Sequence, residues 1–435
     1  MNAEQQTNFV LDCMRRLYDS GVTVRAVTCD GTEVSAKMFR KLGITMDDLS
    51  FPHPSCCFVY VYGIFDVCHM LKLVRNTFSD LQLLVDDENK EVRWFYIKKL
   101  LDVQEESGIR AANKLTVNHI QFNKHKMKVK LAAQVFSNSV ADALDFLRDD
   151  MNDVDQTGNE ATVRFIKVID QLFDFLNCHS PFGSGPKGPL RKENMNYWTS
   201  KLASFREYLQ GLKTDDGLSM LEHRRKTALC GLIVDINSVL ALATEVLTRE
   251  NRVQFKFFLH INLVRIIWNF FSKIRSRSGF NNNPSVKQFQ AAFKSLILKN
   301  CVAPSLNGNC KPLENDDGYI AIGRRSRASN DMSTDSADEV VVEMYVNAVA
   351  QSDFSSNCLC YICGFVAQTQ AKSLSCDDCS AALFDCILDS PKTSVCSLTK
   401  RKDRGGLIHS SHSVYKIVSV TETVIRNEII RTKNA

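Results

Sequence analysis

The chain has no hydrophobic run that could cross a membrane without interruption. Its longest apolar stretch, ALCGLIVDINSVLALATEVL (228–247), is broken by Asp235, Asn237 and Glu245. This stretch therefore predicts a buried helix of a globular protein. The hydrophobic share of 44% and the charged share of 24% agree with that class. With 435 residues and no internal repeat, the chain is expected to form about two to four domains.

Two other features are absent or weak. The opening residues MNAEQQTNFV contain no apolar region typical of a secretion signal, and the 16 cysteines are scattered. We therefore expect a reducing compartment, nuclear or otherwise cytoplasmic, where thiols stay free or bind metal. The net charge is only +5, with a pI near 8.4. This mild basicity permits a nucleic-acid partner without requiring one, and no membrane partner is expected.

The sequence also lacks the GxxxxGK[ST] pattern of a phosphate-binding P-loop. The nearest approach is GSGPKG (183–188), in which a lysine lies among glycines. No predicted strand precedes this segment and no helix follows it closely. It therefore predicts a plain loop.

Residues 1–100 have the pattern of an α/β domain. A β-branched run, VTVRAVTCDG, stops at an Asp-Gly turn signal, and CCFVYVYGIFD is apolar throughout, as a strand covered on both faces would be. Asp66 ends the second run, and HMLKLVRNTF follows with helical spacing. A carboxylate between a strand and a helix is a common position for a catalytic acid. The same residue could instead be the N-cap of the helix.

The remaining chain divides by composition. Residues 101–250 show mainly helical periodicity, and residues 251–300 contain a last apolar helix followed by a basic, Asn-rich turn and another helix. Residues 301–345 are polar and mixed, which predicts a flexible linker. Residues 346–435 form a smaller, cysteine-rich C-terminal domain.

Two CxxC pairs occur in the C-terminal domain. They consist of Cys360, Cys363, Cys376 and Cys379. Thiolates at i and i+3 can share one metal ion, so the four residues are candidate ligands of a structural Zn²⁺. Buried free thiols and a redox role remain as alternatives.

Several segments, in this order along the chain, resemble the P-element transposase family, including the transposase-like part of THAP-domain proteins. They are FDVCHMLKLVRN, WFYIKKLLDVQ, ANKLTVNHIQFNKHKMKVKLAAQVFSNSVADAL, FDFLN, FFSKIRSRSGFNNNPSVKQFQAAFK and CYICGFV. The resemblance covers most of residues 20–370. The N-terminal DNA-binding zinc module common in that family is not found in this sequence.

The resemblance implies an α/β ribonuclease-H-like core, truncated at its N-terminus and interrupted by a large all-α insertion that binds GTP. Such cores cut and join DNA with two divalent cations held by carboxylates, and Mg²⁺ prefers these hard oxygen ligands. Asp66 matches the family's second core acid. The positions of the last core acids hold Arg265 and Trp268, neither of which can ligate a cation. Asp30 is interpreted as a structural turn residue, so the resemblance implies an impaired nuclease centre.

The resemblance also places a GTP site in the insertion. The matching residues are Lys114, Lys128, Val129, Ser137, Phe173, Asp174 and Asn177. A carboxylate such as Asp174 can accept hydrogen bonds from guanine N1–H and N2–H₂, and an aromatic such as Phe173 can contact the base. The alternative is that Asp174 faces solvent and that the lysines form a solvated basic face.

DNA binding is expected near the last core helix, where Lys273, Arg275 and Arg277 are the candidate phosphate contacts. The segments KLVR (72–75) and KHKMKVK (124–130) are further basic clusters, and TKRKDR (399–404) could serve as a nuclear-import signal. We therefore predict a degenerate or domesticated transposase that binds DNA and GTP, with homo-oligomer formation left open.

Two alternatives remain. The first is an active transposase in which Asp86, Asp87 or Glu88 restores the metal site. The second is a protein-interaction scaffold that retains the fold without a ligand.

Overall fold

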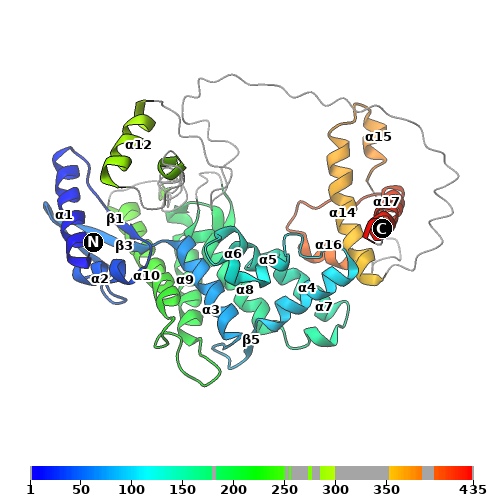
Figure 1. Ribbon diagram of the computed structural model, residues 1–435, viewed down its shortest axis with the longest axis horizontal. Helices are drawn as coiled ribbons and strands as arrows, with labels where there is room; N and C mark the ends of the chain where they lie inside the picture. Colours follow the sequence, from blue (N-terminus) through cyan, green and yellow to red (C-terminus); the bar gives the residue numbers. More distant parts are fainter. Residues whose placement is uncertain are drawn as a thin grey trace. The chain divides into compact units, whose positions relative to one another are not determined.

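The computed structural model describes residues 2–178, 183–249, 254–255, 273–276, 285–298, 352–384 and 396–433 (Figure 1). The chain forms two compact units. Unit 1 comprises Met1–Lys98, Leu115–Ala141 and Gly158–Pro312, and unit 2 comprises Lys99–Lys114, Asp142–Thr157 and Leu313–Ala435.

Unit 1 begins with a small sheet and two helices. Its elements are α1 (Ala3–Asp19), β1 (Ala26–Cys29), α2 (Glu33–Lys41), β2 (Ser50–His53) and β3 (Cys56–Phe65). β3 is central, with β1 parallel on one side and β2 antiparallel on the other. Residues of α1, α2 and the strands share one apolar core, in which Met14, Phe39 and Val61 are buried. The predicted α/β character is therefore confirmed for this region.

β3 is buried only toward its carboxyl end. Ile64 is 2% exposed, whereas Phe58 is 87% exposed. The prediction of a strand covered on both faces is therefore wrong for the first half of β3. A run of apolar residues shows only that their side chains are hydrophobic. Which of these residues become buried depends on the elements that pack against the strand.

Two long helices pack against each other, and the second of them also packs against β3. They are α3 (Val67–Leu81) and α10 (Thr227–Thr244). The segment Thr227–Thr248 is long and apolar enough to cross a membrane, yet 67% of its most apolar window is buried inside the protein. This burial is that of a core helix, as the polar interruptions of the sequence predicted.

The middle of the chain is mainly helical. Its elements in unit 1 are β4 (Leu83–Val85), β5 (Glu91–Arg93), α5 (Val117–Ile120), α6 (Val129–Val135), α8 (Glu160–Leu176), β6 (Leu190–Arg191), α9 (Lys192–Gly211), β7 (Gln254–Phe255) and α12 (Val286–Leu298). α4 (Phe95–Ser107) and α7 (Asn138–Asp149) each contribute residues to both units. Phe165 of α8 makes edge-on ring contacts with Phe78 and Phe136, and this aromatic cluster joins α8 to α3.

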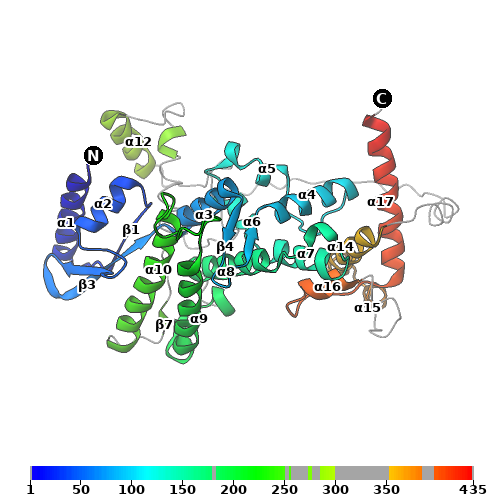
Figure 2. The same cartoon turned by 90° about the horizontal axis from the view of Figure 1, so that it is seen from below.

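Unit 2 contains the C-terminal helices (Figure 2). They are α14 (Asp353–Ala371), α15 (Asp377–Ala381), α16 (Ser397–Lys402) and α17 (His412–Lys433). Arg404 donates two hydrogen bonds, of 2.9 and 3.0 Å, to the buried carboxylate of Asp142 in α7. Arg401 pairs with Asp149 and Asp150. Arg401 and Arg404 of TKRKDR are thus engaged by acids of α7 and of the residue that follows it, inside unit 2.

Candidate active-site and nucleotide-binding region

Two carboxylates emerge at one edge of the sheet. β1 and β3 run parallel with Cys29 opposite Phe65, so Asp30 and Asp66 follow directly at neighbouring strand ends. The carboxyl ends of parallel strands are where α/β sheets place their functional side chains. The fold thus brings the two acids singled out in the sequence to the same edge.

Asp66 caps the helix that follows it. Its side chain accepts a 2.9 Å hydrogen bond from the His69 N–H, and the residue is 6% exposed. This N-cap contact satisfies one of the backbone donors that a helix N-terminus leaves unpaired. The N-cap interpretation of Asp66 is therefore confirmed, and a ligand role would have to use the remaining lone pairs of the same carboxylate.

Asp30 organises a turn. Its Oδ1 accepts hydrogen bonds from the Thr32 N–H at 3.1 Å and from the Ser35 hydroxyl at 3.0 Å. The next residue, Gly31, has φ +69°, and a Cβ there would lie 2.6 Å from the Met70 Cε. Glycine is favoured because this left-handed backbone conformation strains residues with a side chain, and a Cβ would also displace the Met70 methyl group. These contacts agree with the structural role predicted for Asp30.

A third acid, Asp235, lies in the middle of α10. It accepts a 2.6 Å hydrogen bond from the Phe65 N–H and is 1% exposed. Burial raises the pKa of the Asp235 carboxyl well above its usual range, and the nearby Asp66 raises it further. In the sequence, Asp235 stands out only as an interruption of an apolar run. A lone acid in the centre of a buried helix was the signal that could have identified it.

The three acids do not form a metal-binding group. Among the described residues, no set of three or more His, Cys, Asp or Glu side chains is arranged to hold a metal ion. The carboxylates of Asp30 and Asp66 suit a divalent cation in their chemistry, but the third acid, Asp235, is buried and favours the protonated form. The positions of Arg265 and Trp268 lie outside the described residues, so the structure neither places them beside Asp66 nor separates them from it.

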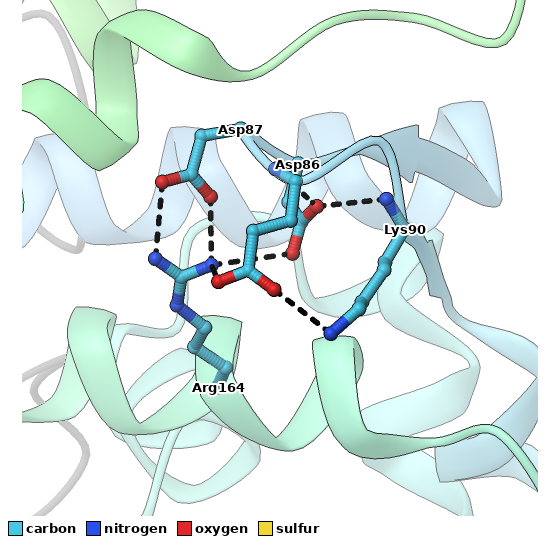
Figure 3. Close-up of polar contacts among 5 residues, drawn as sticks. Asp86, Asp87, Lys90 and Arg164 are labelled. Atoms are coloured by element: carbon cyan, nitrogen blue, oxygen red, sulfur yellow. Dashed lines mark hydrogen bonds and ion pairs between the residues drawn. The ribbon is translucent and has the colours of Figure 1, made fainter.

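The acids at 86–88 belong to a different site. They occupy the turn between β4 and β5, where Arg164 of α8 points its guanidinium between the carboxylates (Figure 3). Arg164 donates to both oxygens of Asp87 at 2.7 and 3.0 Å and pairs with the fully buried Asp86 at 3.6 Å. The Lys90 ammonium pairs with Glu88 at 2.8 Å. A cation of the protein itself therefore occupies the position that a metal would need.

The predicted GTP residues lie on several elements of the insertion. Lys114 is exposed in the loop before α5, Lys128 is the exposed N-cap of α6, and Val129 is its first residue. Ser137 precedes α7 and donates a 2.9 Å hydrogen bond to the Gln134 carbonyl. Lys114 belongs to unit 2, whereas the other predicted GTP residues belong to unit 1.

Phe173, Asp174 and Asn177 form the last turn of α8 and its C-cap. Burial raises the pKa of Asp174, while Lys187, 3.2 Å away, opposes that shift. Lys187 comes from the GSGPKG segment, which the structure folds as a short 3-10 turn rather than a featureless loop. The Asp174 carboxylate is thus half-buried and already paired with a cation, so it does not simply face solvent.

A polar pocket of about 350 Å³ opens beside the strand ends. Its lining includes Gly31, His69, Lys126, Arg224 and Arg225. The fully buried Arg75 guanidinium donates hydrogen bonds to the carbonyls of His125 and Lys126. These bonds hold the backbone that carries Lys126 in place. Because Lys72 and Arg75 are both buried, the basic KLVR cluster does not form an exposed surface that could contact DNA.

The three basic candidates after the last core helix are only partly described. Lys273 and Arg275 are half-buried in a short helical segment, and Arg277 lies outside the described residues.

The four predicted zinc ligands do not converge. Cys363 is fully buried in α14, whereas Cys376 and Cys379 are exposed at α15. Among the described residues, Cys360 instead contacts Cys396, and no tetrahedral group forms. The zinc prediction is therefore not supported, because regular spacing along the chain does not determine which way helical side chains point.

Comparison with known proteins agrees with this architecture. The chain matches the families described as "TNP-like, RNase H N-terminal domain" (residues 1–43), "TNP-like, GTP-binding insertion domain" (68–189), "TNP-like, RNase H C-terminal domain" (269–294) and "DNA transposase THAP9, C-terminal domain" (350–435). These matches define a ribonuclease-H-like protein with an insertion of the GTP-binding type.

Two curated relatives and one solved structure support the same assignment. The chain is 26% identical to human "DNA transposase THAP9", covering 94% of this chain and 47% of that protein, and 25% identical to the Drosophila melanogaster "Transposable element P transposase", covering 76% and 43%. It matches the "Drosophila P element transposase strand transfer complex" with a TM-score of 0.58 and 25% identity, over 68% of this chain and 64% of that one. The chain spans about half the length of these curated relatives. The matches are those of a P-element transposase-like family member.

Proposed function

We propose that this chain is a nuclear DNA-binding protein of the transposase type whose strand-cutting activity is impaired. The observation that carries DNA binding is the pocket at the strand ends, where Lys126, Arg224 and His69 line the space next to Asp30 and Asp66. Arg225 also lines this pocket, but Asp80 neutralises it through a 2.5 Å ion pair. Lys126 and Arg224 are exposed and supply positive charge for a phosphodiester backbone.

Salt dependence tests this assignment. Each phosphate contact releases a counterion, so replacing Lys126 or Arg224 by Ala should reduce the slope of log affinity against log salt by about 1. Lys37→Ala provides a matched control, since Lys37 is an exposed lysine that pairs with Glu33 in α2. If the pocket variants and the control have the same slope on duplex DNA, the pocket is not a DNA-binding site.

Impaired cutting is supported by the state of the two acids at the strand ends. A divalent cation bound by Asp30 and Asp66 would stabilise the attacking and leaving oxygens of a phosphodiester exchange. The protein's own residues engage these acids differently, since Asp66 caps α3 and Asp30 holds a turn. Divalent-dependent nicking of DNA that disappears in Asp66→Asn would overturn the proposal and favour the active transposase.

The alternatives are less well supported. Restoration of the metal site by Asp86, Asp87 or Glu88 is disfavoured because Arg164 and Lys90 already neutralise this turn. A scaffold without any ligand would bind neither DNA nor GTP. GTP binding by the insertion is proposed from the family match at residues 68–189 and from the half-buried Asp174.

A further inference from the structure

Two cysteines of the C-terminal helices lie in direct sulfur contact. The Sγ atoms of Cys360, in α14, and Cys396, the N-cap of α16, are 2.6 Å apart. This separation is much closer to the S–S bond length of about 2.05 Å than to an ordinary contact between two thiols. We propose that Cys360 and Cys396 form a reversible disulfide that ties α14 to α16.

The surroundings distinguish this pair from the other cysteines of α14. Cys360 and Cys396 are both partly exposed, so an oxidant can reach them, whereas Cys358 and Cys363 are fully buried. The hydrogen bond with Cys360, together with the neighbouring His409, lowers the pKa of the Cys396 thiol to about 6. Cys396 is therefore suited to be the attacking thiolate.

A peroxide is the oxidant that converts the two thiols to the disulfide. The Cys396 thiolate attacks one peroxide oxygen, so that an S–O bond forms, the O–O bond breaks and hydroxide leaves. The Cys360 sulfur then attacks the sulfenic sulfur of Cys396, and the hydroxyl group departs with the Cys360 proton as water. The two thiols lose two electrons, the peroxide is reduced to water, and a dithiol reductant reverses the reaction.

A shared zinc ion fits the same sulfurs less well. Two thiolates bound to one tetrahedral Zn²⁺ at about 2.3 Å lie about 3.8 Å apart, well beyond the separation of Cys360 and Cys396. No group of three or more potential ligands is arranged around a metal position in the described part of the chain.

The bond would constrain a helix that holds unit 2 together. Cys396 is the N-cap of α16, whose Arg401 pairs with Asp149 and Asp150 of the α7 region. Fixing this N-cap to α14 restrains the position from which Arg401 reaches these acids. Oxidation would therefore form a covalent link close to where the C-terminal helices contact α7 within unit 2.

Thiol mapping of the full chain tests the proposal. After treatment with hydrogen peroxide, maleimide labelling and proteolysis, we expect a peptide pair linked through Cys360 and Cys396, which separates on addition of dithiothreitol. Cys396→Ser should abolish the link. The double variant Cys376→Ser/Cys379→Ser, which removes the exposed CxxC pair, should retain it.

Two results would overturn the inference. One is a linked peptide that joins Cys376 to Cys379 while Cys360 and Cys396 remain labelled by maleimide. The other is stoichiometric zinc in the purified protein that is lost in Cys396→Ser, because the pair would then be part of a metal site.

Discussion

The Asp235 carboxylate accepts a hydrogen bond from the Phe65 N–H at 2.6 Å, which joins the centre of α10 to the last residue of β3. The next residue, Asp66, begins the turn into α3. A buried acid of the core helix therefore supports the strand end from which the candidate catalytic acid emerges. Asp235 is a positioning residue for this edge of the sheet.

Replacing Asp235 by Asn should flatten the pH dependence of stability. Burial raises the folded-state pKa of Asp235, so its contribution is complete below the unfolded pKa of about 3.9 and is lost as the pH rises through the folded value. In this window the free energy of unfolding should fall by up to about 1.4 kcal/mol per pH unit in the parent and less in the variant. Urea denaturation between pH 4 and pH 8 measures both profiles. The exposed Asp47→Asn is the control, and coincident profiles of parent and Asp235→Asn would refute the prediction.

Replacing Asp66 separates its capping role from any role as a metal ligand. Asp66→Ala should lower the free energy of unfolding by about 1 kcal/mol, because the His69 N–H loses its acceptor. Asp66→Asn should retain most of that stability, since Asn is also a good N-cap. Denaturation with urea distinguishes the two variants. Equal losses of stability for Ala and Asn would argue against the cap.

Arg164 should stabilise the β4–β5 turn far more than Lys90 does. Arg164→Ala leaves the fully buried Asp86 without its cationic partner, which should cost about 1–3 kcal/mol. Lys90→Ala removes an exposed ion pair and should cost less than about 1 kcal/mol. Thermal unfolding of both variants provides the comparison. The assignment fails if added Mg²⁺ restores the stability of Arg164→Ala, because the acids would then be a metal site.

Asp174 should determine guanine recognition. If its carboxylate accepts hydrogen bonds from the guanine base, Asp174→Ala should weaken the binding of a fluorescent GTP analogue by about 10- to 100-fold. Lys187→Ala removes the cation 3.2 Å from the same carboxylate and should leave binding equal or stronger. Titration with GTP and with ATP tests whether the base is read. Unchanged affinity in Asp174→Ala would remove this residue from the site.

Some features of the fold followed from local chemistry and others did not. The strand, acid and helix around Asp66 were predicted because an apolar run followed by a capping residue is a short-range pattern. The run VYKIVSVTETVI, rich in β-branched residues, nevertheless lies within the helix α17. Intrinsic propensities differ by less than about 1 kcal/mol per residue, so tertiary packing can override them.

The sequence by itself determined the family resemblance, the α/β start and the buried character of α10, because these depend on residue order and on periodic hydrophobicity. Only the tertiary structure decided that Asp235 meets Phe65, that Arg164 enters the acidic turn, and that Cys360 contacts Cys396 and not its CxxC partner. These pairs are distant in sequence. Their meeting depends on how helices pack and on the direction of each side chain, which spacing along one element does not encode.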